Sequence, residues 1–451
     1  MEINIPSGDT TQSTSTWSGG ITDTIITKTG AGRFIADVNT NRYRTAGFET
    51  LTIEEGIWQI SDDTGIRTQL NKFSYGELIV GPQGTLELNH YNYPIYPNAT
   101  LTVNGGSVVS IHGGNLCPIY TLNLNGGTIS SDQKPLNSSF TLAGKVTVTK
   151  DSLFECERVT MRTNAGASAT GAGTFDVQGN SVLTFNAELR LNDPGNGNAI
   201  AAVKTGTGTL VLTQSSSGTT SGSSFTVSQG TLEIRNAQAL GTEDVILNGG
   251  CLKTNTGANV TLANAITTSE GTVSTLDTTS HDLTVGNIAG TGTVVKTGSG
   301  TLVPTSFDSG ISLSIQNGEV DVPERTSFAN LFLAGTANFT LEGNSYSEVS
   351  AENLTLAPGA VLEIDLSEYT GDGEILLFTA NEGMYTMTLS AAKIPELSAS
   401  LQHYFFDVRE VATGVYAFDV NPATVPEPTA IMLFLGGLLL LFRRKKESRN
   451  V

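Results

Sequence analysis

Short runs in which apolar and polar residues alternate recur along this chain, and three of them end in Asn-Gly-Gly. These runs are LTVNGG at 101–106, LNLNGG at 122–127 and VILNGG at 245–250. Alternation with a period of two is typical of a strand that buries one face. Asn-Gly supplies backbone that adopts a positive φ where the chain turns. The pattern therefore predicts short strands separated by tight turns.

The spacing between copies distinguishes two kinds of β-structure. Asn104 and Asn125 are 21 residues apart, and the Gly-Thr-Leu copies that begin at Gly208 and Gly230 are 22 residues apart. A repeat near 20 residues matches one coil of a β-solenoid, in which successive coils stack and pair. The alternative is a set of hairpins, because Asn-Gly also favours type I′ turns, but hairpins place a turn every 8–12 residues or so. We favour the solenoid on this spacing.

A second motif, Lys-Thr-Gly-x-Gly, occurs at 28–32, 204–208 and 296–300. Glycines beside a lysine can form a phosphate-binding loop, but that loop requires a following helix N-terminus. After the second copy the residues Thr-Leu-Val-Leu predict a strand instead. We therefore interpret these glycines as turn residues.

The second copy opens a segment, residues 202–254, that resembles the autotransporter-associated β-strand repeat of bacterial surface passenger proteins. Its elements are KTGTGTL, a Ser/Thr/Gly loop, QGTLEI, a Leu-Gly turn and VILNGG, and weaker copies occupy 296–322 and 28–60. The resemblance implies a right-handed parallel β-helix without enzyme activity of its own. An autotransporter would end in a membrane barrel, for which the residues after Leu366 are too few. The chain resembles a passenger that lacks its own translocator.

The residue pattern changes near residue 367, where aromatic runs such as YFFDVREV at 404–411 and VYAFDV at 415–420 appear. These runs predict antiparallel strands that cover the open end of the solenoid. The predicted fold class is all-β. It comprises a right-handed parallel β-helix (solenoid) at 1–366, a small antiparallel β cap at 367–421 and a tail at 422–451 with one C-terminal hydrophobic helix.

The tail reads VPEPTAIMLFLGGLLLLFRRKK at 425–446. Its apolar segment, Ala430–Phe442, would form about 20 Å of helix, whereas a membrane core is about 30 Å thick. The cations that follow would stay in the cytoplasm and leave the body outside. We expect a temporary membrane stop, with a short permanent tail anchor as the alternative. The segment includes Ala430, Ile431, Leu435, Gly436, Gly437, Leu441 and Phe442, and the basic stop is Arg443, Arg444, Lys445 and Lys446.

This order of elements, with Pro426, Glu427 and Pro428 before the apolar segment, resembles the PEP-CTERM sorting tail. The resemblance implies an exopolysaccharide-producing Gram-negative bacterium. It also implies export, transient anchoring in the inner membrane, an exosortase-type transpeptidase as partner, and a final place at the cell surface or in the extracellular matrix. The first residues, MEINIPSGDTTQ, have neither the basic nor the apolar region of a signal peptide. An upstream start would reconcile them with export.

Charge and candidate chemistry narrow the function further. The net charge is -19, and the body carries most of the acidic residues, so we expect no nucleic-acid partner. The four histidines and three cysteines are widely separated, and we expect no cofactor and no metal site. The less favoured alternative is that clusters of the acidic residues bind Ca²⁺. Glu363 and Asp365 share a strand face, as a glycosidase would require of its two carboxylates, and Glu319 and Asp321 do likewise. Alternation places Ile364 inward and both neighbouring acids in solvent, so we favour a solvated face over a catalytic pair.

The sequence predicts a non-enzymatic secreted protein of the cell surface or extracellular matrix that is adhesive or associated with polysaccharide. Outward rows of Thr and Asn, or the aromatic loop with Tyr91, Tyr93 and Tyr96, would contact sugars. The alternative is a polysaccharide lyase or hydrolase on the same scaffold. An ice-binding surface would need a sustained Thr-x-Thr array, and residues 147–149 are only a short match.

Overall fold

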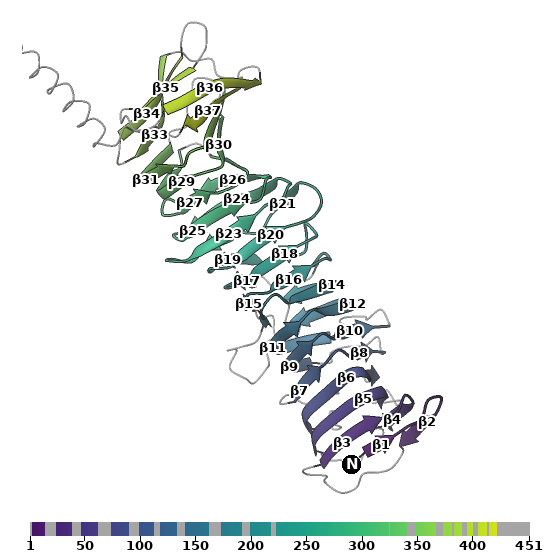
Figure 1. Ribbon diagram of the computed structural model, residues 1–451. Coiled ribbons are helices and arrows are strands. Elements are labelled where there is room, and N and C mark those ends of the chain that lie inside the picture. Colours follow the sequence, from purple (N-terminus) through teal and green to yellow (C-terminus); the bar gives the residue numbers. More distant parts are fainter. Residues whose placement is uncertain are drawn as a thin grey trace, which may run out of the picture.

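The chain folds into a rod of stacked β-coils that runs from the N-terminal strands to the C-terminal ones (Figure 1). Every regular element among the described residues is a strand, which confirms the all-β prediction. The computed structural model describes residues 2–13, 24–37, 47–61, 74–89, 99–111, 118–132, 140–161, 173–191, 199–217, 222–323, 325–340, 349–366, 373–380, 383–389, 395–399, 405–412 and 415–421.

The strands form three longitudinal faces, within which each strand pairs in parallel with its counterpart in the next coil. Face A contains β1 (Glu2–Asn4), β3 (Thr24–Thr29), β5 (Gly47–Ser61), β6 (Ser74–Asn89), β7 (Thr100–Val103), β9 (Pro118–Asn125), β11 (Phe140–Lys150), β13 (Thr174–Val177), β15 (Ala201–Thr205), β17 (Ser224–Val227), β19 (Asp244–Leu247), β22 (Ile266–Thr268) and the end of β24 (Leu283–Gly290).

Face B contains β2 (Thr10–Ser13), β4 (Arg33–Asp37), the second halves of β5 and β6, β8 (Ser107–Ser110), β10 (Thr128–Ser131), β12 (Ser152–Met161), β14 (Val182–Leu191), β16 (Thr209–Leu212), β18 (Thr231–Ile234), β20 (Cys251–Thr254), β23 (Val273–Asp277), β25 (Thr293–Thr297), β27 (Ser312–Ile315), β29 (Ser327–Leu333) and β31 (Val349–Leu356). Face C contains β21 (Val260–Leu262), the start of β24, β26 (Thr301–Phe307), β28 (Glu319–Asp321), β30 (Thr336–Thr340) and β32 (Val361–Asp365).

Asn-Gly-Gly forms corners of the coil and not hairpins. Strand β7, which precedes Gly105, pairs with β6 and β9, whereas β8, which follows it, pairs with β6 and β10. The two strands around the motif therefore lie on different faces. Gly105 has a φ of +81°, and Gly126 and Gly249 repeat this conformation in their own coils. Only the solenoid alternative agrees with this pairing.

The length of a coil varies more than the shortest repeats predicted. Asn125 stacks on Asn104 as the 21-residue spacing requires, with its Nδ2 3.4 Å from the Oδ1 of Asn104. Other stacked pairs are separated by as few as 17 residues, at Asp321 and Asn338, or as many as 31, at Glu155 and Asn186. Most extra residues lie in the connections between strands, and a few form bulges that shift the register within long strands such as β6, β11 and β12.

The inward halves of the alternating strands build one continuous apolar core. Rows of side chains run along the rod, as where Leu101 faces Leu122 in the next coil. Near the middle of the chain the row becomes aromatic, and the rings of Phe154 and Phe185 stack with centroids 4.3 Å apart. Each such side chain contributes about 1.5–3 kcal/mol by burial, so the stability of a coil depends on its two neighbours.

Pairing becomes antiparallel beyond the last parallel coil. Strand β32 pairs with β37 (Val415–Asn421), which pairs with β36 (Phe405–Ala412). Strand β33 (Gly373–Ala380) pairs in parallel with the first residues of β31, outside its face B segment. It also pairs with β34 (Gly383–Leu389), which pairs with β35 (Pro395–Ala399). The predicted C-terminal helix lies outside the described residues.

Candidate functional site

Two sets of sequence-predicted site residues lie outside the described residues. They are the sorting tail, with Pro426, Glu427, Pro428, the apolar segment and the basic stop, and the loop with Tyr91, Tyr93 and Tyr96. Within the described ranges, no helix has the length and apolar character needed to cross a membrane. The candidate residues that the structure does describe lie on the outer faces and at the corners of the solenoid.

Outward ladders of polar side chains follow face A, as the alternation predicted. Asn123 donates from Nδ2 to the Oγ1 of Thr102 at 3.4 Å, and Thr102 donates to the Oε1 of Glu77 at 3.3 Å. Further along the face, Lys145 forms an ion pair of 2.8 Å with Asp176. These charged side chains interrupt the rows, so face A lacks the uniform Thr-x-Thr array that an ice-binding surface would need.

The Lys-Thr-Gly-x-Gly motif buries its lysine inside the corner that it forms. Lys28, Lys204 and Lys296 are all fully buried. The Nζ of Lys204 donates to the carbonyl oxygens of Thr205 at 2.8 Å, Gly206 at 2.7 Å and Gln229 at 3.0 Å. The first two carbonyls belong to its own corner and the third to the next coil. The lysine therefore joins two successive coils.

The other two copies repeat this arrangement. Lys28 donates to Thr29 and Gly30 and, at 2.9 Å, to the carbonyl of Glu55 in the next coil. Lys296 donates to Thr297 and Gly298 and, at 3.1 Å, to Asn317. The first and second copies connect face A to face B, whereas the third connects face B to face C. The motif specifies a corner geometry, independent of which corner it occupies.

Glycines leave the space that the buried ammonium groups require. Gly230 follows the carbonyl that Lys204 reaches, and its φ is +65°. A Cβ at this position would lie 2.8 Å from the Nζ of Lys204 and 2.4 Å from the carbonyl oxygen of Gly206. Gly318 has the same relation to Lys296. The glycine of the following coil is thus part of the motif.

The burial of these lysines lowers their proton affinity without making them reactive. Burial lowers the pKa of Lys204 to about 8, and the nearby Asp176 carboxylate opposes the shift. The pKa of Lys296 is also lowered to about 8 by burial. All three amine protons are donated to carbonyl oxygens, so the nitrogen has no accessible lone pair for nucleophilic attack. The arrangement is a structural clamp, and no phosphate loop forms there.

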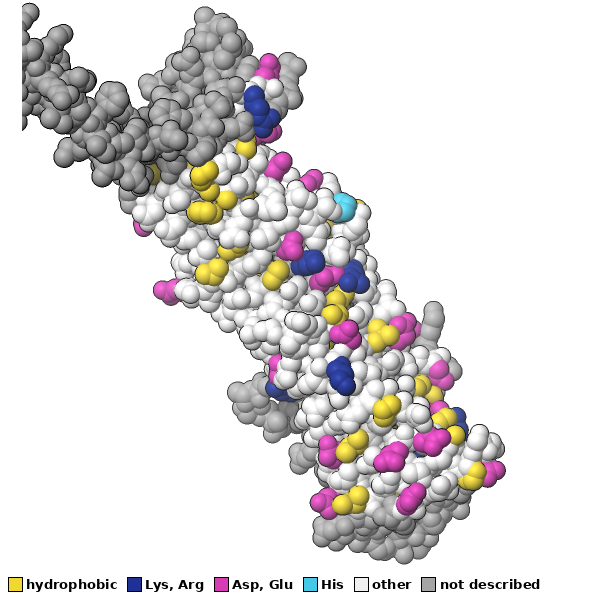
Figure 2. All heavy atoms as spheres, in the orientation of Figure 1, with side chains coloured by type: hydrophobic (Ala, Val, Ile, Leu, Met, Phe, Trp, Pro, Cys, Tyr) yellow, Lys and Arg dark blue, Asp and Glu magenta, His cyan; other side chains and the backbone are white. Residues whose placement is uncertain are grey.

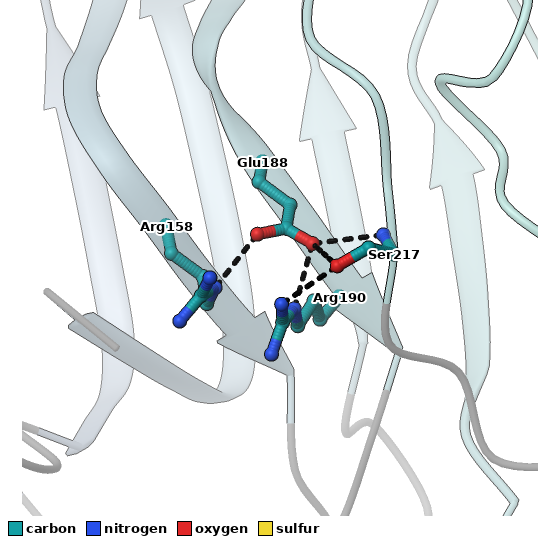
Figure 3. A network of polar contacts seen from close by, with 4 residues as sticks. All are labelled: Arg158, Glu188, Arg190 and Ser217. Atoms are coloured by element: carbon teal, nitrogen blue, oxygen red, sulfur yellow. Dashed lines mark hydrogen bonds and ion pairs between the residues drawn. The ribbon is translucent and has the colours of Figure 1, made fainter. Parts of the chain in front are cut away.

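A network of polar contacts centres on Glu188 at the surface of β14 (Figure 3). Its Oε2 lies 2.7 Å from the Nε of Arg158, and its Oε1 lies 2.7 Å from the Nε of Arg190. The N–H of Ser217 donates to the same Oε1 at 2.8 Å. Burial alone would raise the pKa of Glu188, but the hydrogen bonds from Arg190, Arg158 and Ser217 outweigh it and lower the pKa to about 2. Both carboxylate oxygens are engaged, so the network joins coils and holds no free catalytic carboxylate.

We expect Glu188→Gln to lower the free energy of unfolding by about 2 kcal/mol at pH 7, because the variant loses two charge-assisted contacts at a partly solvated site. The carboxylate's pKa is lower in the folded state than in the unfolded state. Its contribution is therefore present above pH 4.5 and is lost as the pH falls toward 2. Urea unfolding at pH 7 and pH 2 measures this. An equal deficit at both pH values would contradict the network's role.

On face C the two predicted carboxylate pairs come together across coils. Asp321 pairs with Asn338, which pairs with Glu363. The Nδ2 of Asn338 donates to Glu319 at 3.2 Å and to Asp321 at 2.9 Å. Burial is the main cause that raises the pKa of both Asp321 and Glu363, and the negative charge of Glu319 raises both further.

The alternation predicted for this strand is confirmed. Ile364 is fully buried, and Glu363 and Asp365 on either side of it are only partly buried. The sequence did not indicate that the pair Glu319 and Asp321 would lie on the same face of the rod as Glu363, because that depends on the register of β28, β30 and β32. In the described part of the chain, no group of three or more His, Cys, Asp or Glu side chains is placed to hold a metal ion.

Sequence reasoning also missed a buried acid. Glu243 points inward at the corner before β19 and is 2% exposed. Neither of its carboxylate oxygens has a hydrogen-bond partner. Burial raises the pKa of Glu243 to about 7, and the nearby backbone N–H groups of Glu243 itself, Leu191 and Thr242 offset only part of this effect.

No protein-family model, curated protein or solved structure matches this chain.

Proposed function

We propose that this chain is a non-enzymatic β-solenoid that is exported and displayed at the cell surface or in the extracellular matrix, where it associates with polysaccharide. Its coils would be right-handed, as the passenger-type repeats imply. The antiparallel strands after β32 would cap the apolar core, and the tail with Pro426, Glu427 and Pro428 would deliver the protein through an exosortase-type transpeptidase.

One observation carries this proposal: outward polar side chains form ladders over successive coils. Asn330 donates to Ser312 at 2.8 Å, and Asn353 donates to Asn330 at 2.9 Å. Stacked coils repeat about every 4.8 Å, so such ladders offer many equivalent hydrogen-bonding groups along one direction. A long polymer of hydroxylated units gains affinity from many weak contacts of this kind.

The test is binding of the full chain to polysaccharides, both uncharged and acidic, by retardation in native gels. We expect at least one class of polysaccharide to retard the protein while the polymer stays intact. If no polysaccharide retards the chain, the proposed association is wrong.

The second candidate function is cleavage of polysaccharide on face C. It is supported by the convergence of Glu319, Asp321 and Glu363, with the pKa of two of these acids raised. One carboxyl that stays protonated beside one that ionises is the pattern of a glycosidase pair. Against this candidate, Asn338 donates hydrogen bonds to both Glu319 and Asp321. A contact within the sheet therefore explains the positions of these two acids without a catalytic role.

The double variant Asp321→Asn/Glu363→Gln separates the two candidates. If face C is catalytic, incubation with polysaccharide lowers the viscosity of the polymer, and the double variant abolishes this loss. We expect neither the wild-type chain nor the variant to lower the viscosity. A decrease that disappears in the double variant would replace the binding proposal with an enzymatic one.

A further inference from the structure

Face B changes character along the rod. In the coils up to β20 its outward side chains include the ion pairs of Arg33 with Glu87 and of Glu233 with Arg235 and Lys253. From β23 to β31, two adjacent outward rows contain no charged residue. We name these ten side chains the neutral strip: Val273, Thr293, Ser312, Asn330 and Asn353 in one row, and Thr275, Val295, Ser314, Phe332 and Thr355 in the other.

The neutral strip also concentrates exposed apolar side chains. Three large hydrophobic residues are exposed among the described residues, and two of them, Val273 at 61% and Phe332 at 36%, lie on this strip. Figure 2 shows apolar side chains over β27 and β29, with few charged ones beside them. These apolar side chains lie on an uncharged strip, so they are accessible to a ligand that has apolar faces.

The ring of Phe332 lies beside a ladder of hydrogen-bonding groups. Asn330 precedes it by two residues and therefore points to the same side of β29. Asn330 itself is held by Ser312 on one side and Asn353 on the other. Asn353 and Thr355 at the end of the strip are exposed. An aromatic ring next to fixed amide and hydroxyl groups suits a ligand that has apolar ring faces and equatorial hydroxyls.

The size of the strip selects a single extended chain as its occupant. Five coils span about 19 Å, and two side chains at positions i and i+2 span about 7 Å. The footprint of roughly 130 Å² is far below the 800 Å² or so per partner of a stable protein interface. A second copy of the protein would therefore need contacts well beyond the strip, whereas one polysaccharide strand along the rod fits within it.

The charge of the strip selects the kind of polysaccharide. The whole chain carries a net charge of -19, and no cation on the strip is available to pair with an acidic sugar. An anionic polymer would be repelled by the protein's field without a compensating ion pair. An uncharged polymer avoids that cost.

We propose that the neutral strip binds one strand of an uncharged polysaccharide along the rod axis, with Phe332 stacked on a sugar ring and Asn330 and Asn353 hydrogen-bonded to its hydroxyls. This inference rests on the proposed polysaccharide association and assigns it a location and a ligand class.

The test uses native gels that contain hydroxyethyl cellulose as the uncharged probe or alginate as the acidic one. We expect hydroxyethyl cellulose to retard the full chain, and Phe332→Ser to weaken this binding about tenfold. Ser314→Glu, which places a carboxylate in the same row, should weaken it at least as much. The matched control is Ile25→Ser on face A, because Ile25 is the third exposed hydrophobic residue. It should bind as the wild type does.

The possible outcomes separate the strip from the function. If hydroxyethyl cellulose retards the wild type, Phe332→Ser and Ser314→Glu equally, the strip is not the binding site and the polysaccharide association stands. If only alginate retards the protein, the assigned ligand class is wrong while the association again stands. If neither polymer retards it, both proposals are overturned for these probes and the strip loses its basis.

Discussion

Lys204→Met is expected to lower the free energy of unfolding by about 3 kcal/mol at pH 7. Methionine fills a similar volume but donates no hydrogen bond, so the carbonyls of Thr205, Gly206 and Gln229 lose their common donor. Three charge-assisted hydrogen bonds contribute roughly 1.5–3 kcal/mol each. The burial that lowers the pKa of Lys204 from 10.5 to about 8 costs roughly 3 kcal/mol of that gain.

At pH 7 the amine of Lys204 remains protonated, because its pKa lies above that value. The effect should appear in the urea midpoint and as a loss of amide protection in β15 to β18, the strands that meet at this corner. The control is Lys150→Met, which makes the same change at an exposed side chain of β11 and should alter stability by less than about 0.5 kcal/mol. Equal stability of Lys204→Met and the wild type would refute the clamp.

Glu243→Gln is expected to stabilise the protein, by about 3 kcal/mol at pH 9. The wild-type carboxyl must ionise inside the corner at this pH, although neither oxygen has a hydrogen-bond partner. Glutamine has the same shape and remains neutral. The pKa of the Glu243 carboxyl, by contrast, rises from 4.5 in the unfolded chain to about 7 in the folded one, a difference that corresponds to about 3 kcal/mol.

The sign of this effect depends on pH in a defined way. Between pH 4.5 and 7 the unfolded chain has already lost the proton that folded Glu243 retains. The folded state therefore binds more protons, and wild-type stability falls as the pH rises through this window. At pH 4 both states are protonated, so Glu243→Gln and the wild type should agree within about 0.5 kcal/mol. Glu270→Gln, at an exposed position, is the control and should be neutral at both pH values.

A stability gain for Glu243→Gln that is the same at pH 4 and pH 9 would show that packing, not ionisation, is responsible. A loss of stability at pH 9 would show that the carboxylate has a partner after all. Either result would contradict the account of a buried, unpartnered acid.

The solenoid could be predicted because its signals are local. Asn104-Gly105 specifies a positive φ at the glycine, and the spacing to Asn125 gives the length of one coil, so a few residues were enough to distinguish stacked coils from hairpins. Coil lengths were predicted less well, because extra residues enter the connections and, at bulges, the strands themselves. The register between coils, which brings Asp321 toward Glu363, depends on those lengths and is not a local property.

The lysine clamp left a signal that charge-based reasoning overlooks. Lysine is usually exposed, and in this motif we interpreted only the glycines, as turn residues. The strand that contains Lys204, Ala201–Thr205, nevertheless alternates so that Ala202 and Lys204 both point inward. Alternation together with the recurring Thr-Gly was therefore sufficient to place the lysine inside. Glu243 lies at a corner without such a repeat, and the sequence alone gave no reason to expect it to be buried.

The measurement that tests the stacked-coil account most directly is the distance between spin labels along one outward row of face A. Thr100 and Thr226 are five coils apart in the register, and Thr100 and Thr267 are seven coils apart. We predict separations of about 24 Å and about 34 Å, an increase of about 4.8 Å per coil. Two similar distances, or a shorter one for the more distant pair, would contradict the stacking on which the clamps, the ladders and the neutral strip all depend.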